Sequence, residues 1–247
     1  MTEYFFILAD SELELIPNEI LRERCILNNA RARGKAPERI LLDASHHHPA
    51  FGKLPDAERR GRPDIVHFFL MLCMDSDLSA EGKLRVFVHT RNNDVIAVNP
   101  QTRLPPHYPR FIGLIETLYE QRVVPSRENA LLELRENISL ETLVNALKPD
   151  KVVVLDSAGE VVPLADKIAS LKADRVVIVI GGFSKGSYKS DLNKLGKPIK
   201  VSLGPRMLKV WTVTSKVLCA IEHSKDVAAL KPEKPSKLRR ARKKTAA

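Results

Sequence analysis

The sequence has no apolar run long enough to cross a membrane. A bilayer-spanning helix needs about 20 consecutive apolar residues, and no hydrophobic stretch among the 247 residues approaches that length. The amino-terminal stretch MTEYFFILADSELELIP contains an apolar patch, but this patch is too short and too acidic at its flank for a signal peptide. We therefore expect a cytoplasmic protein with no membrane partner.

Cysteine is scarce, and no metal-ligand spacing is present. Cys25, Cys73 and Cys219 are far apart in apolar helical contexts, which is typical of reduced core thiols in an intracellular protein. Three consecutive histidines occur at 46–48, but consecutive residues do not share one face and no companion Cys/His pair follows. We expect these histidines to line a polar surface beside Asp43, and we expect no metal.

The positive charge is concentrated at the carboxyl end. Of the net charge of +10, residues 231–247 supply eight Lys or Arg against one Glu, or +7, which leaves 10 − 7 = +3 for the other 230 residues. Such a tail is typical of a disordered basic arm that binds nucleic acid without sequence preference. The alternative is a solvated tail with no partner. Any specific RNA site must come from local clusters in the body.

Apolar periodicity predicts alternating strands and helices with no internal repeat. Strands apolar on both faces and separated by helices indicate an α/β fold, with a mainly parallel sheet flanked by helices on both sides. A hairpin with the turn RNND is expected between the strands at 83–90 and 94–100. The other predicted strands are 4–9, 39–45, 151–157, 175–183 and 197–204, and the predicted helices are 17–31, 63–75, 108–122, 161–172 and 207–224.

An arginine cluster precedes the buried helix predicted at 63–75. In RRGRPDIVHFFLMLC, Pro63 suits the first helical position and Asp64 the first turn, so an ordinary helix start is one interpretation. The other is a phosphate- or base-binding device made by Arg59, Arg60 and Arg62. Asp64 is close enough in sequence to hold the Arg62 guanidinium in one orientation, as such recognition requires.

A second basic cluster lies in VNPQTRLPPHYPRFIG. Arg103 and Arg110 flank a proline-rich loop ahead of the predicted helix at 108–122. His107 and Tyr108 are available for stacking on an unpaired base. A surface loop with two solvated arginines is the alternative.

Two glycine-containing loops follow predicted strands. The sequence VIGGFSKGSY places Gly181 and Gly182 at the carboxyl end of a buried strand, where open α/β sheets bind ligands. VSLGPRMLKVW repeats the arrangement one element later. Neither segment contains a Walker loop or a GxGxxG motif. The two loops favour an adenosine-type cofactor, although αβ turns also use glycine routinely.

Several blocks together resemble a known family. LLDASHHHPAFGKLP, RRGRPDIVHFFLMLCMDSDL, LRVFVHTRNNDVIAVNPQTRLP, YPRFIGLIETLY, IGGFSKGSY and LKVWTVTSKV occur in this order. They resemble the Emg/Nep family of small-subunit rRNA pseudouridine N1-methyltransferases over roughly residues 1–224. The RPDI–H and HTR…VNP…R–P blocks are specific to this family, whereas the glycine loop alone is not.

The resemblance implies a SPOUT-type fold and an RNA-methylating enzyme. The expected fold is one domain over 1–230, with RNA-facing insertions at about 43–122, a cofactor-binding trefoil knot at about 150–224, and a basic tail at 231–247. S-adenosylmethionine is the expected cofactor. The expected partners are small-subunit rRNA with a pseudouridine in a hairpin loop, a second copy of the chain, and ribosomal proteins met during assembly. The short amino terminus and compact loops suggest an archaeal member.

The resemblance also assigns site residues. Arg62, Arg103 and Arg110 match RNA-contacting arginines of the family, and Asp64 matches the aspartate that steadies the first of them. A further family arginine falls at Pro106, which puts one phosphate contact in doubt. The GPRML run also differs from the family's usual run. The matching cofactor positions are Gly159, Gly181, Gly186, Leu203, Gly204, Pro205, Arg206, Met207 and Leu208.

Two roles for Asp64 and two alternative functions stay open. N1 of pseudouridine becomes a good nucleophile when it loses its proton, which a carboxylate can accept while an arginine stabilises the anion. Asp64 is therefore either the residue that orients Arg62 or the general base. One alternative function is a SPOUT enzyme that acts on another RNA position. The second, favoured by Pro106 and the altered GPRML run, is an rRNA-binding assembly factor with little catalysis.

Overall fold

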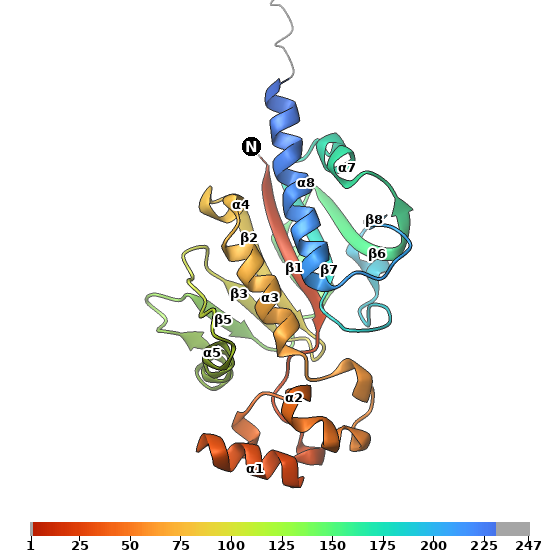
Figure 1. Ribbon diagram of the computed structural model, residues 1–247. Coiled ribbons are helices and arrows are strands. Elements are labelled where there is room, and N and C mark those ends of the chain that lie inside the picture. Colours follow the sequence, from red (N-terminus) through yellow and green to blue (C-terminus); the bar gives the residue numbers. More distant parts are fainter. Residues whose placement is uncertain (1, 231–247) are drawn as a thin grey trace, which may run out of the picture.

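A single mixed sheet forms the centre of the molecule. The computed structural model describes residues 2–230, and the basic tail at 231–247 lies outside the described residues. Within the described part, the sheet has eight strands in the order β4-β5-β3-β2-β1-β7-β6-β8 (Figure 1). The expectation of an α/β fold with a mostly parallel sheet flanked by helices is confirmed.

The parallel half of the sheet is built around β1. This strand pairs in parallel with β2 on one side and β7 on the other, and β6 then pairs in parallel with both β7 and β8. Nearly every residue of β1 is buried, because both faces of the strand are covered by helices. These strands are β1 (Glu3–Ser11), β2 (Leu84–Thr90), β6 (Lys151–Val161), β7 (Arg175–Gly181) and β8 (Ile199–Ser202).

The other end of the sheet is antiparallel. β2 and β3 form the predicted hairpin, and β5 and β4 continue the sheet outward from β3. The antiparallel strands are β3 (Val95–Val98), β4 (Val123–Val124) and β5 (Leu132–Arg135). Strands β4 and β5 were not predicted, because each is too short to show a period of two.

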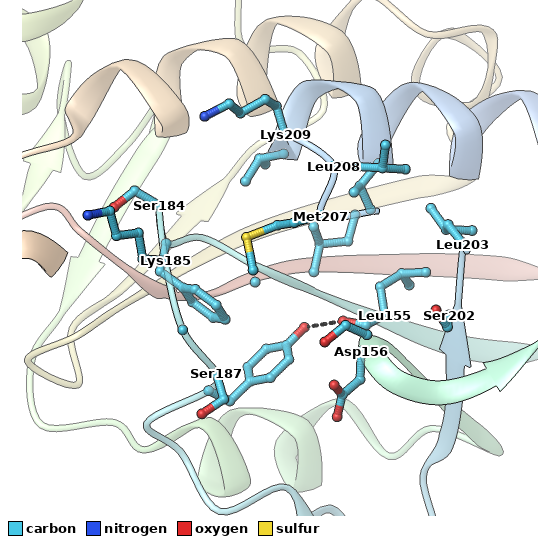
Figure 2. A pocket seen from close by; sticks show the side chains of 18 of the residues that line it. Leu155, Asp156, Ser184, Lys185, Ser187, Ser202, Leu203, Met207, Leu208 and Lys209 are labelled. Atoms are coloured by element: carbon cyan, nitrogen blue, oxygen red, sulfur yellow. Dashed lines mark hydrogen bonds between the residues drawn. The ribbon is translucent and has the colours of Figure 1, made fainter. Parts of the chain in front are cut away.

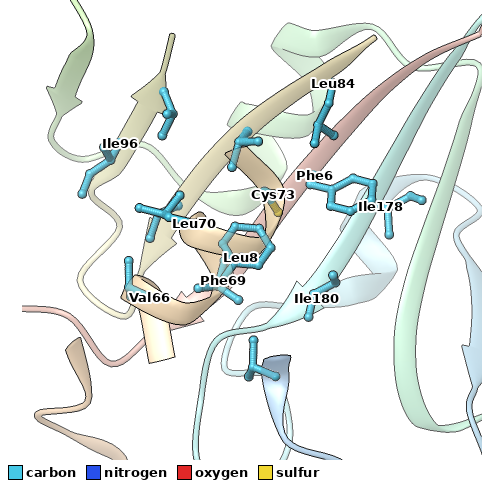
Figure 3. Close-up of a cluster of buried hydrophobic side chains, with 14 of the residues drawn as sticks. Phe6, Leu8, Val66, Phe69, Leu70, Cys73, Leu84, Ile96, Ile178 and Ile180 are labelled. Carbon is cyan, nitrogen blue, oxygen red and sulfur yellow. The ribbon is translucent and has the colours of Figure 1, made fainter. Parts of the chain in front are cut away.

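Alternate side chains of the strands enter two separate cores. Phe6 and Leu8 of β1 face the larger core (Figure 3). Residues of α3, α5, α7 and α8 complete this core. Phe5 and Ile7 face the opposite core, which α6 covers. The helices are α3 (Pro63–Met74), α4 (Asp77–Ala80), α5 (Tyr108–Gln121), α6 (Leu140–Leu147), α7 (Leu164–Ser170) and α8 (Val210–Leu230).

A small lobe is inserted between β1 and α3. It contains α1 (Arg24–Arg33) and α2 (Ala44–His47) and has its own apolar cluster, and it lies beyond the carboxyl end of β1 (Figure 1). Glu116 of α5 fastens the lobe to the sheet domain. Its buried carboxylate accepts two hydrogen bonds from Arg33, at 2.7 and 2.6 Å, and one each from Lys35 and the Leu41 amide.

Two elements of this lobe differ from their prediction: the helix predicted at 17–31 is present only from Arg24 onward, and the strand predicted at 39–45 is wrong. The segment 17–31 is a 3-10 turn, Asn18–Ile20, followed by α1, because on one continuous helix Ile20 would point away from Ile26 and the lobe core. The segment 39–45 forms only one bridge, between Leu41 and Leu15. Its strand cannot continue because the Asp43 side chain accepts a hydrogen bond from the Ser45 amide at 2.8 Å and caps α2.

Candidate active site

A cavity lies at the carboxyl ends of the parallel strands β6, β7 and β8. Its volume is about 290 Å³, and its walls come from β6, from the loops after β7 and β8 and from the start of α8 (Figure 2). This is the edge at which parallel α/β sheets bind ligands. The lining residues of β6 are Leu155, Asp156 and Ser157, and the two loops follow Gly181 at the end of β7 and Ser202 at the end of β8. The two glycine-containing loops singled out in the sequence therefore meet in one place.

Two consecutive glycines let the loop after β7 lie close to its surroundings. A Cβ atom on Gly182 would lie 2.4 Å from the Ser11 hydroxyl oxygen and 2.8 Å from the Leu8 side chain. A Cβ atom on Gly181 would lie 2.7 Å from the ring of Phe183. Because Ser11 and Leu8 leave no room for a Cβ atom at Gly182, the loop reaches the carboxyl end of β1 without a side chain between them.

The cavity wall is mostly apolar, with a few polar groups at defined places. Leu155, Ile180 and Val201 provide apolar surface, and Asp156 and Ser202 provide polar side chains. Such a combination suits a ligand with an aromatic part and a polar part.

Tyr188 closes one side of this cavity. Its hydroxyl donates a 2.8 Å hydrogen bond to the Leu155 carbonyl, and its ring contacts Phe183 edge-on. Burial raises the pKa of Tyr188, so the phenol stays a hydrogen-bond donor. The hydrogen bond joins the loop after β7 to β6 across the sheet edge.

Most of the predicted cofactor positions line the cavity. Gly159 and Pro205 do not. A Cβ atom on Gly159 would lie 2.6 Å from the Val201 amide nitrogen, so this glycine permits the close approach of β6 and β8 instead. The predicted residues that do line the cavity are Gly181, Gly186, Leu203, Gly204, Arg206, Met207 and Leu208.

Arg62 lines the same cavity from the side of α3. Its Nε and Nη2 donate hydrogen bonds of 2.8 and 2.7 Å to the two carboxylate oxygens of Asp64, in the first turn of the helix. These bonds raise the pKa of Arg62 and hold the guanidinium in one plane. The contact expected between these two side chains is present.

The two neighbouring arginines are held in other ways. Arg60 is buried and donates hydrogen bonds of 2.8 and 2.6 Å to the carboxylate of Glu14, which anchors the lobe. The side chain of Arg59 lies against the loop after β7, where it donates to the Ser187 carbonyl. Because Arg60 is buried and Arg59 is bound to the loop after β7, we leave both out of the proposed RNA-binding set.

The second basic cluster lies beside the first. His67 of α3 is 2.9 Å from the Pro105 carbonyl, which holds the proline-rich loop against the start of α3. Arg103, Pro106 and Arg110 are exposed on this loop and on the first turn of α5. Within residues 2–230, no hydrogen bond or ion pair involves the two arginine side chains.

Tyr108 is not available for base stacking in this structure. Its hydroxyl donates a 2.7 Å hydrogen bond to Asp43, and its ring lies 5.8 Å from that of His67. Burial, and then the hydrogen bond to Asp43, raise the pKa of this phenol. Tyr108 instead joins the lobe to α3 and α5. Of the two rings expected to stack on a base, that of His107 is exposed.

Glu12 was not predicted as a site residue, and it lies next to the loop after β7, called the cavity loop below (residues 182–190). Its carboxylate is buried, accepts hydrogen bonds from the Ser184 amide and hydroxyl at 3.0 and 3.2 Å, and has its pKa raised by burial. Asp156 and Ser202 of the cavity wall were also missed. Both residues could have been predicted from the sequence, because each lies near the carboxyl end of a predicted strand.

The histidine run and the cysteines differ in part from expectation. His46 and His48 are exposed, but His47 is buried in the lobe rather than on a polar surface. Cys73 is buried, whereas Cys219 is exposed and is no core thiol. In the part of the chain that the structure describes, no group of three His, Cys, Asp or Glu is placed to hold a metal ion. None of its helices is both long and apolar enough to span a membrane.

Comparison with known proteins identifies the family. The family model described as EMG1/NEP1 methyltransferase matches residues 6–222. The chain belongs to the EMG1/NEP1 methyltransferase family. It is 44% identical over 219 residues to a protein of Pyrococcus furiosus named ribosomal RNA small subunit methyltransferase Nep1, covering 87% of this chain and 95% of the relative.

Further members agree with this assignment. A Nep1 of Staphylothermus marinus is 36% identical over 88% of this chain and 94% of its own length. The crystal structure of Archaeoglobus fulgidus Nep1 bound to S-adenosylhomocysteine superposes with a TM-score of 0.79 at 36% identity. That alignment covers 91% of this chain and 99% of the other.

Proposed function

We propose that this protein transfers a methyl group from S-adenosylmethionine to N1 of a pseudouridine in small-subunit rRNA, and so contributes to small-subunit assembly. One observation carries the proposal: Arg62, held by Asp64, lines the same cavity as the glycine loop after β7. A cofactor in the cavity and an RNA base at Arg62 would therefore be neighbours. The names of the relatives agree with an rRNA substrate.

The cavity has the chemistry that the cofactor requires. Its apolar wall suits an adenine ring, and Asp156, Ser202 and the backbone of the loops suit the ribose and the amino-acid part. Gly181, Gly186 and the run from Leu203 to Leu208 would hold the cofactor largely through backbone atoms. When bound, S-adenosylmethionine supplies an electrophilic methyl group. A family member at 36% identity is described as bound to its product, S-adenosylhomocysteine.

Arg62 and Asp64 act on the substrate base. Loss of the N1 proton leaves negative charge on the pyrimidine carbonyl oxygens, and a fixed guanidinium stabilises that charge. Both carboxylate oxygens of Asp64 already accept hydrogen bonds from Arg62. We therefore assign to Asp64 the orientation of Arg62, and general-base catalysis is the alternative role. Holding the base and the methyl donor in line supplies much of the rate enhancement.

The RNA-binding surface extends from Arg62 to the proline-rich loop. Arg103 and Arg110 are free to contact phosphates of a hairpin loop, whose unpaired bases are accessible without opening a helix. Pro106 removes one contact that the family usually makes. The tail at 231–247 adds affinity that depends on salt but not on sequence.

We further propose that the active protein is a homodimer with the family's trefoil knot. Three large apolar side chains near the cavity support a second copy. Phe68 of α3 and Met207 are 50% and 70% exposed, and the Phe68 ring lies 5.2 Å from that of Trp211 on α8. The knot would involve residues of about 150–224, within a single domain over 1–230. We place its action in the cytoplasm of an archaeal cell, together with other assembly proteins.

The test is a methyl-transfer assay with labelled S-adenosylmethionine on two small-subunit rRNA hairpins. The hairpins are identical except for uridine or pseudouridine at the candidate loop position. Label in the pseudouridine hairpin alone is the expected result. Label in both, or at another nucleotide, would favour a SPOUT enzyme of different specificity. Binding of both RNAs and of the cofactor without any label would favour an assembly factor.

A further inference from the structure

The segment from Asp56 to Arg62 crosses from the lobe to the start of α3 and passes along the cavity loop. At one end, Asp56 forms ion pairs of 3.3 Å with both Lys189 and Arg91. At the other end, Arg62 lines the cavity. This segment therefore contacts the loop after β7 and ends at Arg62, the arginine proposed to contact the substrate base.

Arg59 makes the most specific of these contacts. Its Nη1 donates a 2.8 Å hydrogen bond to the Ser187 carbonyl, and its guanidinium lies over the Phe183 ring at 4.5 Å from the ring centroid. Phe183 and Ser187 both line the cavity. The Nε atom of Arg59 is buried and has no hydrogen-bond partner within residues 2–230. The Nε edge of the guanidinium is therefore turned into the protein, away from any bidentate contact with a phosphate in solution.

The backbone around Arg59 is fixed as well. Its carbonyl accepts a 2.6 Å hydrogen bond from Arg91. The preceding carbonyl, of Glu58, lies 3.2 Å from the Ser184 hydroxyl and shares the one proton of that hydroxyl with the Glu12 carboxylate. Gly186 lies beneath the guanidinium, since a Cβ atom there would be 3.6 Å from Nη1. Arg59 and the cavity loop are thus held together by charge, ring and backbone contacts.

We propose that Arg59 is a positioning residue that holds the cofactor-binding loop from the side of the lobe, and that it is not an RNA contact. The proposal rests on the proposed function only in taking the cavity as the site of S-adenosylmethionine. A loop already held in its binding conformation loses less conformational entropy when the cofactor binds. Removing Arg59 should therefore weaken cofactor binding, although Arg59 itself touches no part of the cofactor in this proposal.

The experiment compares Arg59→Met and Arg59→Lys with a matched control, Arg110→Met. Affinity for S-adenosylhomocysteine is measured calorimetrically without RNA, and affinity for the rRNA hairpin is measured without cofactor at several salt concentrations. Arg59→Met should weaken S-adenosylhomocysteine binding by about tenfold, the loss of a charged hydrogen bond and a cation–π contact. Arg59→Lys should lose less, because an ammonium can still reach the Ser187 carbonyl but cannot lie flat on the ring.

The RNA measurements separate a positioning role from a phosphate contact. Arg59→Met should keep the RNA affinity and salt dependence of the wild type, whereas Arg110→Met should lower the salt slope by about one. In the methylation assay, Arg59→Met should raise KM for the cofactor and regain the wild-type kcat at saturation. General unfolding would lower kcat as well, so a raised KM with an unchanged kcat would not arise from it.

Two results would overturn the proposal: unchanged S-adenosylhomocysteine affinity in Arg59→Met, or a loss of RNA affinity and salt slope like that of Arg110→Met. The proposed function fails separately. If the wild type binds S-adenosylhomocysteine but labels no RNA, the binding comparison of the Arg59 variants can still be made.

Discussion

The guanidinium of Arg62 and the carboxylate of Asp64 share two hydrogen bonds, of 2.8 and 2.7 Å, at the first turn of α3. Both side chains are about one-third exposed, so the pair lies at the surface where RNA can reach it. The orientation of Arg62 therefore depends on a residue two positions away and on the fixed start of a buried helix. Pro63, at the first helical position, fixes the backbone between them.

Asp64→Asn should lower methylation through Arg62. An asparagine keeps one acceptor oxygen and loses the charge, so Arg62 is held by one hydrogen bond to a neutral acceptor and by no ion pair. We expect kcat to fall by about tenfold, since a charged hydrogen bond contributes roughly 1.5–3 kcal/mol and part of it remains. The measurement is single-turnover methylation of the pseudouridine hairpin by the wild type, Asp64→Asn, Arg62→Met and the double variant.

The double variant distinguishes the two roles of Asp64. If Asp64 only orients Arg62, then Asp64→Asn should have no further effect once Arg62 is replaced. A general base would instead cost a further factor of about 10² or more in the Arg62→Met background. If Asp64→Asn leaves both methylation and RNA binding unchanged, both roles are wrong.

Gly182→Ala should disturb the cavity loop by steric conflict. The added methyl group would lie 2.4 Å from the Ser11 oxygen and 2.8 Å from Leu8, so the loop or β1 must shift. Overpacking of this kind costs about 1–3 kcal/mol of the free energy of unfolding. We expect weaker binding of S-adenosylhomocysteine as well. The matched control is Gly52→Ala in the lobe, where an added Cβ meets nothing within 4 Å.

Urea unfolding and calorimetric titration measure the two effects of Gly182→Ala. Gly52→Ala should leave cofactor affinity unchanged. Equal losses of cofactor affinity in both variants would show that the close approach at Gly182 is not what shapes the loop.

The arginines of RRGR differ in whether their partners could be predicted from the sequence. The partner of Arg62 is two residues away, so its pairing with Asp64 could be predicted. The partners of Arg60 and Arg59 are 46 and 128 residues away, at Glu14 and Ser187, and no local pattern distinguishes these arginines from a free one.

The same distinction applies to the fold. The buried strands β1 and β7 were predicted from continuous apolar runs, and so was the meeting of the two glycine-containing loops at one sheet edge. The segment 39–45 has the composition of a strand but only Leu15 bridges to it, at Leu41, and a strand needs a partner along its whole length. Pairing over a long sequence distance is decided by the tertiary structure.

Phe68→Glu should convert a dimer into monomers. Phe68 is half exposed and contacts Trp211, and a carboxylate at this place would have to be desolvated in the proposed interface. The measurement is molar mass by light scattering during size-exclusion chromatography. The control is Leu27→Glu on α1, another exposed apolar residue, which lies in the lobe. A monomeric wild type, or a Phe68→Glu variant that stays dimeric, would contradict the proposed interface.

Deletion of residues 231–247 should weaken RNA binding without changing specificity. The tail carries a net charge of +7, and each cation that neutralises a phosphate releases counterions. The affinity of the truncated protein should therefore depend less steeply on salt, by about 0.7 in slope for each lost contact to single-stranded RNA. The methylated nucleotide should stay the same. A change in the methylated position would show that the tail takes part in selecting the substrate.

His47 should make the protein less stable as the pH falls from 6.5 to 4. Its Nδ1 accepts a 3.0 Å hydrogen bond from the Asp43 amide, and burial lowers the pKa of this imidazole to about 4. Between these pH values the unfolded chain binds the proton and the folded protein does not, so folding stability is complete above pH 6.5 and is lost on acidification. The difference of pKa corresponds to roughly 3 kcal/mol at most.

The comparison of His47→Asn with His46→Asn isolates this contribution. An asparagine oxygen can accept the Asp43 hydrogen bond but does not titrate, so His47→Asn should lose less stability than the wild type between pH 7 and pH 4. His46 is exposed, and His46→Asn should follow the wild type. The free energy of unfolding is measured by urea titration at both pH values. An equal loss in His47→Asn and the wild type would show that the acid sensitivity arises elsewhere, for example at the buried His89, whose pKa burial also lowers.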